Sequence, residues 1–181
     1  MGKKVILLSG VHGVGKGYFI AKKLKESDEI ICFGASELIR QYQDSEDAGY
    51  KKVKNVSGNQ EILLEALNHA KRNINKHVLL DGHLCIINSD DKIERIPEAF
   101  ILQAGIKGII LLQEQISIIE QRQQSRDGIG LSDKMIGKIQ CEEKEYAESL
   151  FKKYQIPFKI ISSKCKRDEF LQIINEMGKE S

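Results

Sequence analysis

The glycine-rich segment at residues 10–17, GVHGVGKG, carries the strongest chemical signal in the sequence. It has the G-x-x-x-x-G-K spacing of a phosphate-binding loop, directly after the apolar run Val5–Ser9 and before a helical stretch from Tyr18 to Leu24. Glycines let successive backbone N–H groups turn toward one anion, and the N-terminus of the following helix adds a partial positive charge. Lys16, which ends the pattern, can reach the β- and γ-phosphates of a nucleotide.

The loop therefore predicts a binding site for ATP with Mg²⁺. The residues expected to contact ATP are Gly10, Val11, His12, Gly13, Val14, Gly15, Lys16, Gly17 and Tyr18. Gly17 departs from the usual pattern, because that position normally holds a Ser or Thr whose hydroxyl binds Mg²⁺. Binding of ATP can survive this change, since Mg²⁺ keeps several water ligands, whereas turnover is expected to suffer.

A carboxylate follows a second buried run, where His77–Leu80 leads into Asp81-Gly82-His83. An aspartate at the carboxyl end of a strand beside a phosphate loop is typical of a residue that holds Mg²⁺ through water, so Asp81 is the metal candidate. The alternative is a turn, because Asp-Gly is also a turn signal. His83 either contacts substrate or caps a loop.

Two arginines, Arg122 and Arg126, lie four residues apart in a segment with helical periodicity. At that spacing both side chains share one helix face and can reach one site. A planar guanidinium binds two phosphate oxygens at once, which suits stabilisation of a phosphoryl group in transfer. Together with Lys16 they are the predicted catalytic residues; the alternative is a pair of solvated surface arginines.

Apolar runs of strand length alternate with segments of helical periodicity and must position these side chains. The predicted strands lie at 5–8, 30–33, 78–80, 109–112 and 158–161. The predicted helices lie within 18–24, 62–70, 116–122, 135–151 and 170–177. This alternation predicts an α/β fold, a five-stranded parallel sheet with helices on both faces. A small hairpin is expected over 84–96, at the edge of the sheet that carries the phosphate loop.

Length and composition narrow the class of protein. The 181 residues fit one domain over 1–181, and the balance of 28 Lys and Arg against 26 Asp and Glu argues against a nucleic-acid partner. No apolar run approaches the roughly 20 residues of a membrane helix, so no membrane partner is expected. The four cysteines contain no C-x-x-C pair, which argues against a zinc ribbon or disulfide scaffold and favours a reducing, cytoplasmic location.

Four motifs in this order resemble the nucleoside monophosphate kinase family, adenylate kinase in particular. Besides the phosphate loop, FGASELIR at 33–40 is similar to the family's Ser-x-x-x-Leu-Arg segment, and Asp81-Gly82 to its Asp-Gly. Arg122-x-x-x-Arg126 is similar to the arginine pair that leads into its lid. The matches span about residues 5–130. The short lid is more similar to archaeal-type adenylate kinases, and Asn59-Gln60 with Asp-Gly-His resembles a little-characterised bacterial ATP-binding group.

The resemblance implies the three-layer fold of P-loop NTPases and transfer of the γ-phosphoryl of Mg-ATP to a nucleoside monophosphate. It implies that Ser36 approaches the acceptor base and that Arg40 binds the acceptor phosphate. The alternative for Arg40 is a solvent-facing residue on an amphipathic helix. Gln60 and His83 are further acceptor-side candidates, Gln60 with helix capping as its alternative. The acceptor-side segment is expected over 34–75 and the lid over 126–133. His83-Leu-Cys replaces the family's Phe-Pro-Arg, which removes one acceptor arginine. The family's later lid arginines are also missing, and the helix from Ser132 offers Lys134 and Lys138 instead.

These departures leave different functions open. The first is the phosphotransferase just described, with nucleotides as its substrates. The second is an ATP-binding module that senses or slowly hydrolyses ATP and reports to a protein partner, which Gly17 and the missing arginines favour. A kinase of other small molecules on the same fold is the third. The polar segment from Gln43 to Gly58 either covers the acceptor side or forms a solvated helix.

Overall fold

The computed structural model describes residues 4–25, 27–44, 56–128 and 130–178. Its strands are β1 (Val5–Ser9), β2 (Ile30–Gly34), β3 (His77–Asp81), β4 (Cys85–Ile87), β5 (Ile93–Arg95), β6 (Ile106–Leu112) and β7 (Phe158–Ile161). Its helices are α1 (Lys16–Lys23), α2 (Ala35–Gln43), α3 (Val56–Lys71), α4 (Glu98–Gln103), α5 (Ile116–Asp127), α6 (Asp133–Tyr154) and α7 (Arg167–Met177).

Five strands form one sheet in the order β2-β3-β1-β6-β7, and every pairing is parallel. The predicted α/β fold with a five-stranded parallel sheet is therefore confirmed. β1 lies at the centre because its five residues are all buried and pair on both sides, with β3 and with β6. The predicted hairpin is also present, as the antiparallel pair β4–β5.

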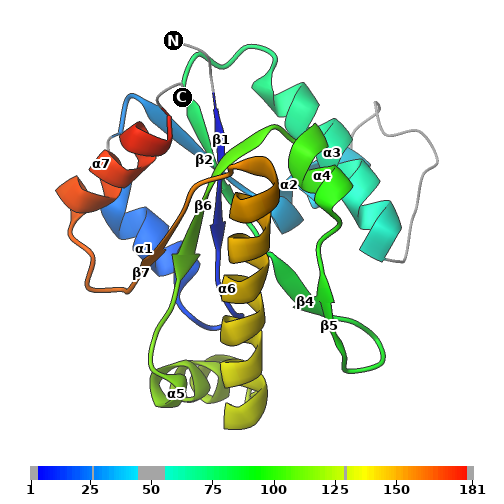
Figure 1. The fold of residues 1–181 in the computed structure, drawn as a ribbon, viewed down its shortest axis with the longest axis vertical. Helices are drawn as coiled ribbons and strands as arrows, with labels where there is room; N and C mark the ends of the chain where they lie inside the picture. The colour runs from blue at the N-terminus through cyan, green and yellow to red at the C-terminus, as the bar shows by residue number, and fades with distance from the viewer. Residues whose placement is uncertain (1–3, 26, 45–55, 129, 179–181) are drawn as a thin grey trace.

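Helices cover both faces of the sheet. Because side chains alternate along a strand, Val5 and Leu7 of β1 point to one face and Ile6 and Leu8 to the other. The first face packs against α3, α4 and the carboxyl half of α6, and the second packs against α1, α7 and the start of α6. Figure 1 shows α1 and α7 on one side of the sheet and α3 with α4 on the other, with α6 crossing in front.

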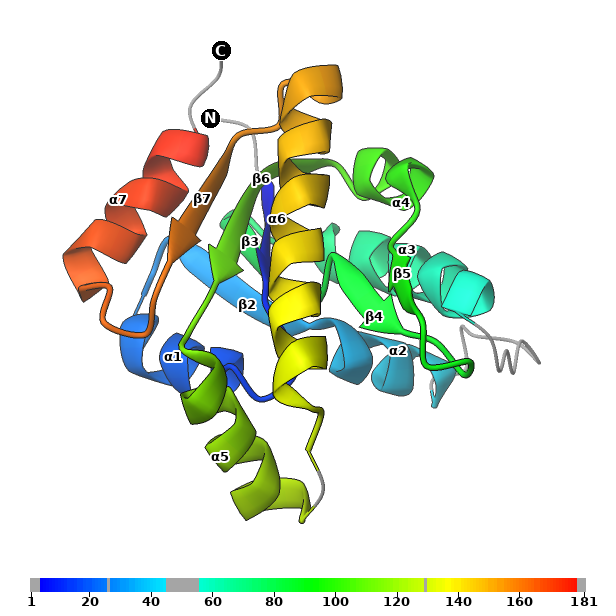
Figure 2. The same ribbon diagram turned by 60° about the horizontal axis from the view of Figure 1, so that its bottom comes forward.

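The carboxyl ends of the parallel strands meet at one edge of the sheet. Figure 2 shows that the chain leaves β1 at this edge, which lies near α1 and α5. The β4–β5 hairpin lies beside α6 and follows β3 directly in the chain. Connections at this edge are therefore the segments from which a site can be assembled.

Several elements differ from the sequence prediction, and helix α2 was not among the predicted helices. Helix α1 begins at Lys16 rather than at residue 18, because Gly15 ends the loop in a left-handed conformation and the next residue starts the helix. Helix α4 was not predicted, since its six residues are too few to reveal a period, although Phe100 and Ile101 are buried. No helix in the described part of the chain is long and apolar enough to cross a membrane.

Candidate functional site

The phosphate loop folds as a tight turn between β1 and α1. The Val14 N–H donates to the Val11 carbonyl over 3.0 Å, and Gly13 and Gly15 have left-handed φ values of 86° and 101°. Glycine adopts these angles without strain. At Gly13 a Cβ atom would also lie 2.6 Å from Cγ of Gln123, so this position has no room for a side chain.

Lys16 lies at the floor of the site, with its side chain 10% exposed. Its Nζ donates to the Gly10 carbonyl over 3.0 Å and lies 3.8 Å from Oδ1 of Asp81. Burial lowers the pKa of Lys16, while the nearby carboxylates of Asp81 and Glu143 act against that shift. The loop lysine and the strand aspartate thus form an ion pair, as expected if both serve one phosphate site.

A cavity of about 560 Å³ opens above this ion pair and collects most of the predicted residues. Its lining comprises Val11, His12, Gly13, Gly15, Lys16, Gly17, Tyr18, Gly34, Ala35, Ser36, Glu37, Asp81, Gly82, His83, Arg122 and Arg126. The phosphate loop, both candidate arginines, the metal candidate and two acceptor-side candidates therefore face one space. Gly10 and Val14 contribute to the loop but not to the lining.

Arg122 and Arg126 lie on α5 and reach the phosphate loop from outside. Nη1 of Arg122 donates to the Val14 carbonyl over 2.5 Å, and Nη2 of Arg126 contacts Nε2 of His12. Their spacing on one helix face brings both guanidinium groups to the same cavity, as expected from the sequence. Three cationic side chains thus surround the space in front of the loop.

The residues after β3 form the opposite wall. Burial raises the pKa of Asp81, and the charge of Lys16 only partly offsets this shift. Burial, with Lys16 and His12 adding to it, lowers the pKa of His83 to about 3. His83 is therefore a neutral imidazole at physiological pH, able to donate from one ring nitrogen and accept at the other.

A second cavity of about 160 Å³ adjoins the first on the side of α2 and α3. Ser36 and His83 line both cavities, together with Ala35 and Gly82, so the two spaces are continuous at these residues. Gln60, at the start of the described part of α3, lines the smaller cavity. Three of the four predicted acceptor-side residues therefore surround one pocket.

The fourth acceptor-side candidate, Arg40, lies elsewhere. Its guanidinium donates to Glu37 over 2.6 Å and lies 3.6 Å from Asp44, and its side chain is 64% exposed. Arg40 belongs to the lining of neither cavity. Arg40 therefore takes the alternative position, on the solvent-facing side of α2. Glu37 and Asp44 stand one helical turn before and after the arginine and hold it along the helix surface.

Glu143 is a site residue that the sequence did not reveal. It is buried on α6, where its Oε1 accepts from the Ser9 hydroxyl over 2.5 Å. The Leu84 N–H donates to the same hydroxyl oxygen over 2.6 Å. Burial raises the pKa of Glu143, although the charge of Lys16 acts in the other direction. The signal in the sequence was a lone acidic residue at a core position of a long amphipathic helix.

Gln123 is a second residue that the sequence missed. It is 2% exposed on α5, and its Nε2 donates to the His12 carbonyl over 2.5 Å while its Oε1 accepts from the Leu131 N–H over 2.7 Å. One side chain thus joins the phosphate loop to the segment before α6. It stands between the two arginines that the spacing had singled out.

The site fits a nucleotide with Mg²⁺ only in part. Asp81 faces the cavity and can hold a metal-bound water, whereas Gly17 offers no hydroxyl to the ion. No cluster of three or more metal-binding side chains occurs among the described residues. An ion here would thus be held mainly by phosphate oxygens and water, which Mg²⁺ accepts.

Two predicted segments are only partly described. The acceptor-side segment 34–75 and the polar stretch from Gln43 to Gly58 include residues 45–55, which lie outside the described residues. The predicted lid, 126–133, includes residue 129, which also lies outside them. Among the described residues of that lid, Leu131 is held by Gln123.

Comparison with known proteins finds one matching family model and solved structures with a similar fold. A family model described as an AAA domain matches residues 9–140. A crystal structure of a gluconokinase from Sinorhizobium meliloti 1021 is similar, with a TM-score of 0.50, 12% identity and coverage of 96% of this chain and 90% of that chain. The Deinococcus radiodurans tunicamycin resistance protein has a TM-score of 0.61, 14% identity and coverage of 99% and 98%. No curated protein matches by sequence.

Proposed function

The chain belongs to the AAA domain family, and from that premise we propose that it is a P-loop kinase that transfers the γ-phosphoryl group of Mg-ATP to a small molecule. One observation carries the proposal. Lys16, Arg122 and Arg126 face a cavity that also holds Asp81 and continues into a second pocket. A hydrolase needs only the first space, whereas a phosphotransferase needs a place for an acceptor next to it.

The donor side of the site follows from charge. Backbone N–H groups of the phosphate loop and Lys16 would hold the β- and γ-phosphates. Arg122 and Arg126 would stabilise the charge on the equatorial oxygens of the phosphoryl group as it moves. Bound Mg²⁺ would neutralise the phosphates, with Asp81 as the protein group that orients it through water.

The acceptor predicted from sequence is a nucleoside monophosphate, which brings a phosphate of its own. Arg40 is the predicted partner of that phosphate, and it would have to leave Glu37 and Asp44 to reach the pocket. This observation argues against a nucleoside monophosphate as the acceptor, but it does not argue against kinase activity. The titles of the two similar structures, a gluconokinase and a tunicamycin resistance protein, support keeping the acceptor class broader than nucleotides.

A second candidate function is an ATP-binding module without an acceptor. The observation that favours it is Gly17, which lines the cavity yet offers no hydroxyl for Mg²⁺. Such a module would bind ATP and hydrolyse it slowly. A module of this kind needs no acceptor pocket, so it does not account for the pocket lined by Ser36 and His83.

Measuring ADP formation from Mg-ATP, with and without candidate acceptors, tests the proposal. We expect stimulation by an acceptor of at least tenfold over hydrolysis by the protein alone. The panel should contain nucleoside monophosphates, nucleosides, sugars and aromatic alcohols. Tight ATP binding with no stimulation by any compound would favour the second candidate.

A further inference from the structure

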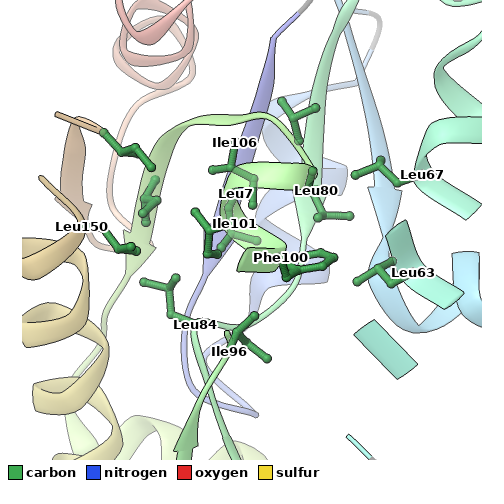
Figure 3. Packing of buried hydrophobic residues seen from close by; sticks show 14 of the residues in the cluster. Leu7, Leu63, Leu67, Leu80, Leu84, Ile96, Phe100, Ile101, Ile106 and Leu150 are labelled. Atoms are coloured by element: carbon green, nitrogen blue, oxygen red, sulfur yellow. The ribbon is translucent and has the colours of Figure 1, made fainter. Parts of the chain in front are cut away.

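The pocket on the acceptor side is lined mostly by apolar side chains. One leucine each from β1, β3 and α3 surrounds its 160 Å³, with Phe100 of α4 and the isoleucines Ile39, Ile86 and Ile96. Figure 3 shows five of them, Leu7, Leu63, Leu80, Ile96 and Phe100, converging between the strands and the helices. A ligand in this pocket must therefore bury apolar surface.

Charge is distributed unevenly between the two sides of the site. The cationic side chains of the larger cavity are Lys16, Arg122 and Arg126, all on the phosphate loop or α5. None of the described residues that line the smaller pocket is a Lys, Arg, Asp or Glu. An anionic acceptor would lose its hydration in this pocket without gaining a described cation in return.

Gln60 lines this pocket and carries a hydrogen-bond acceptor that no described residue uses. Its Oε1 is buried and has no hydrogen-bond partner among the described residues. A buried polar atom without a partner costs free energy, and a bound ligand with an O–H or N–H group removes that cost. Ser36 and Asn59 offer further polar contacts in the same pocket.

A third cavity extends the apolar space across β4. It measures about 290 Å³ and is lined by Val11, His12, His83, Cys85, Ile86, Ile87, Leu131 and Ile139. His83 and Ile86 belong to this cavity and to the smaller pocket as well. The acceptor side therefore has two apolar lobes that meet at His83, next to the phosphate loop.

We infer that the phosphoryl acceptor is an uncharged hydroxyl compound with an apolar body, which buries that body in these lobes and donates a hydrogen bond to Oε1 of Gln60. The inference rests on the proposed function, since it names the acceptor of that reaction. It replaces the nucleoside monophosphate with a neutral molecule. The cationic side chains Lys16, Arg122 and Arg126 then bind only the phosphates of ATP.

A hydroxyl acceptor requires a place for its proton. The hydroxyl oxygen attacks the γ-phosphorus, the bond from the γ-phosphorus to the β,γ-bridging oxygen breaks, and ADP leaves with that electron pair. The hydroxyl proton passes to water, so each transfer releases one proton. A phosphate acceptor would arrive ionised and would release none.

Binding to the ATP-loaded protein tests the acceptor class apart from turnover. The probes are three matched pairs: adenosine and AMP, thymidine and thymidine monophosphate, and phenylethyl alcohol and phenylethyl phosphate. Each is titrated by ligand-observed NMR against protein saturated with Mg²⁺ and a non-hydrolysable ATP analogue. We expect at least one neutral member to bind at least tenfold more tightly than its phosphorylated partner. Tighter binding of the phosphorylated members, or no binding of any neutral member, would overturn the inference.

Variants connect the binding to Gln60. Gln60→Leu removes the unpartnered oxygen and is expected to weaken binding of the neutral probe about tenfold, the effect of one buried hydrogen bond. Gln172→Leu makes the same change at an exposed position of α7 and should leave binding unchanged. Equal affinity of the Gln60→Leu and Gln172→Leu proteins would overturn the inference. Phosphorylation of AMP alone would refute the neutral acceptor but would support the proposed kinase activity. Binding of a neutral probe without any phosphoryl transfer would support the binding pocket but would argue against the kinase activity.

Discussion

The carboxylate of Glu143 accepts a hydrogen bond of 2.5 Å from the hydroxyl of Ser9, the last residue of β1. The same hydroxyl oxygen accepts from the Leu84 N–H, three residues after Asp81. The phosphate loop begins immediately after Ser9, so one buried group on α6 sets the distance between the loop and the residues that follow β3. Glu143 is a positioning residue in this account, because it does not line the cavity itself.

Glu143→Gln is expected to change how stability depends on pH. Burial raises the pKa of Glu143 in the folded protein above its ordinary value of 4.5, so the folded state binds this proton more tightly than the unfolded state. The resulting stabilisation is fully present below the unfolded pKa and is lost as pH rises through the folded pKa. We therefore expect the free energy of unfolding of wild type to fall relative to that of the variant as pH rises from about 4.

Urea unfolding at a series of pH values measures this difference. The variant keeps a side-chain oxygen for the Ser9 hydroxyl, so it is expected to fold. Parallel stability curves for the two proteins across the whole series would mean that Glu143 is not perturbed by its burial.

Gln123→Leu is expected to destabilise the protein by about 1–3 kcal/mol, because the His12 carbonyl and the Leu131 N–H both lose their partner. ATP affinity should fall as well, since the phosphate loop loses its tie to α5. The neighbouring residue Gln124 is exposed, so Gln124→Leu is the matched control. Urea unfolding and ATP titration of both variants provide the measurements, and equal stability of the two would refute the role given to Gln123.

Gly17→Ser is expected to raise turnover and to make it depend more strongly on Mg²⁺. A Cβ atom at Gly17 would meet nothing within 4 Å, so the hydroxyl can be added without displacing a neighbour. Gly17→Ala adds the carbon without the hydroxyl and separates the two effects. Steady-state rates of ADP formation over a range of Mg²⁺ concentrations give the comparison. Identical behaviour of the Ser and Ala variants would show that the hydroxyl has no part to play here.

Asp81→Asn is expected to reduce acceptor-dependent turnover about 100-fold or more, because the variant loses the carboxylate that would hold Mg²⁺ through water. Burial raises the pKa of Asp81 above its ordinary value of 3.8, so the wild-type rate should fall on acidification at a higher pH than an exposed aspartate would give. The variant has no carboxylate to titrate there and should lack this limb. A pH–rate profile of each protein checks the assignment, and an unchanged acid limb in Asp81→Asn would refute it.

The sheet could be predicted from sequence because its inner strands, β1, β3 and β6, are buried on both faces. Runs such as Val5–Leu8 and Val78–Leu80 have no polar interruption, and their alternation with helical periods leaves few other architectures. Lys16 and Asp81 could be placed because Lys16 closes the loop that follows β1 and Asp81 is the last residue of β3. Parallel strands end at one edge of the sheet, so residues at their carboxyl ends meet there.

Other parts of the site depend on packing between distant segments, which a pattern in one segment does not reveal. Glu143 and Ser9 are 134 positions apart, and only the fold brings them together. Arg40 was expected at the acceptor pocket, but local pairing with Glu37 and Asp44 holds it outside. The apolar character of that pocket arises from residues on six helices and strands, so no single motif encodes it.

Following the γ-phosphoryl group of ATP provides the most direct test of the kinase assignment. The protein is incubated with ATP labelled in the γ-phosphate, Mg²⁺ and a small-molecule cell extract, and the labelled products are separated. The account predicts a new labelled compound with wild type and at least a 100-fold lower yield with Lys16→Met, which lacks the cation at the transferring group. Label that appears only as inorganic phosphate, from a protein that binds ATP, would contradict it.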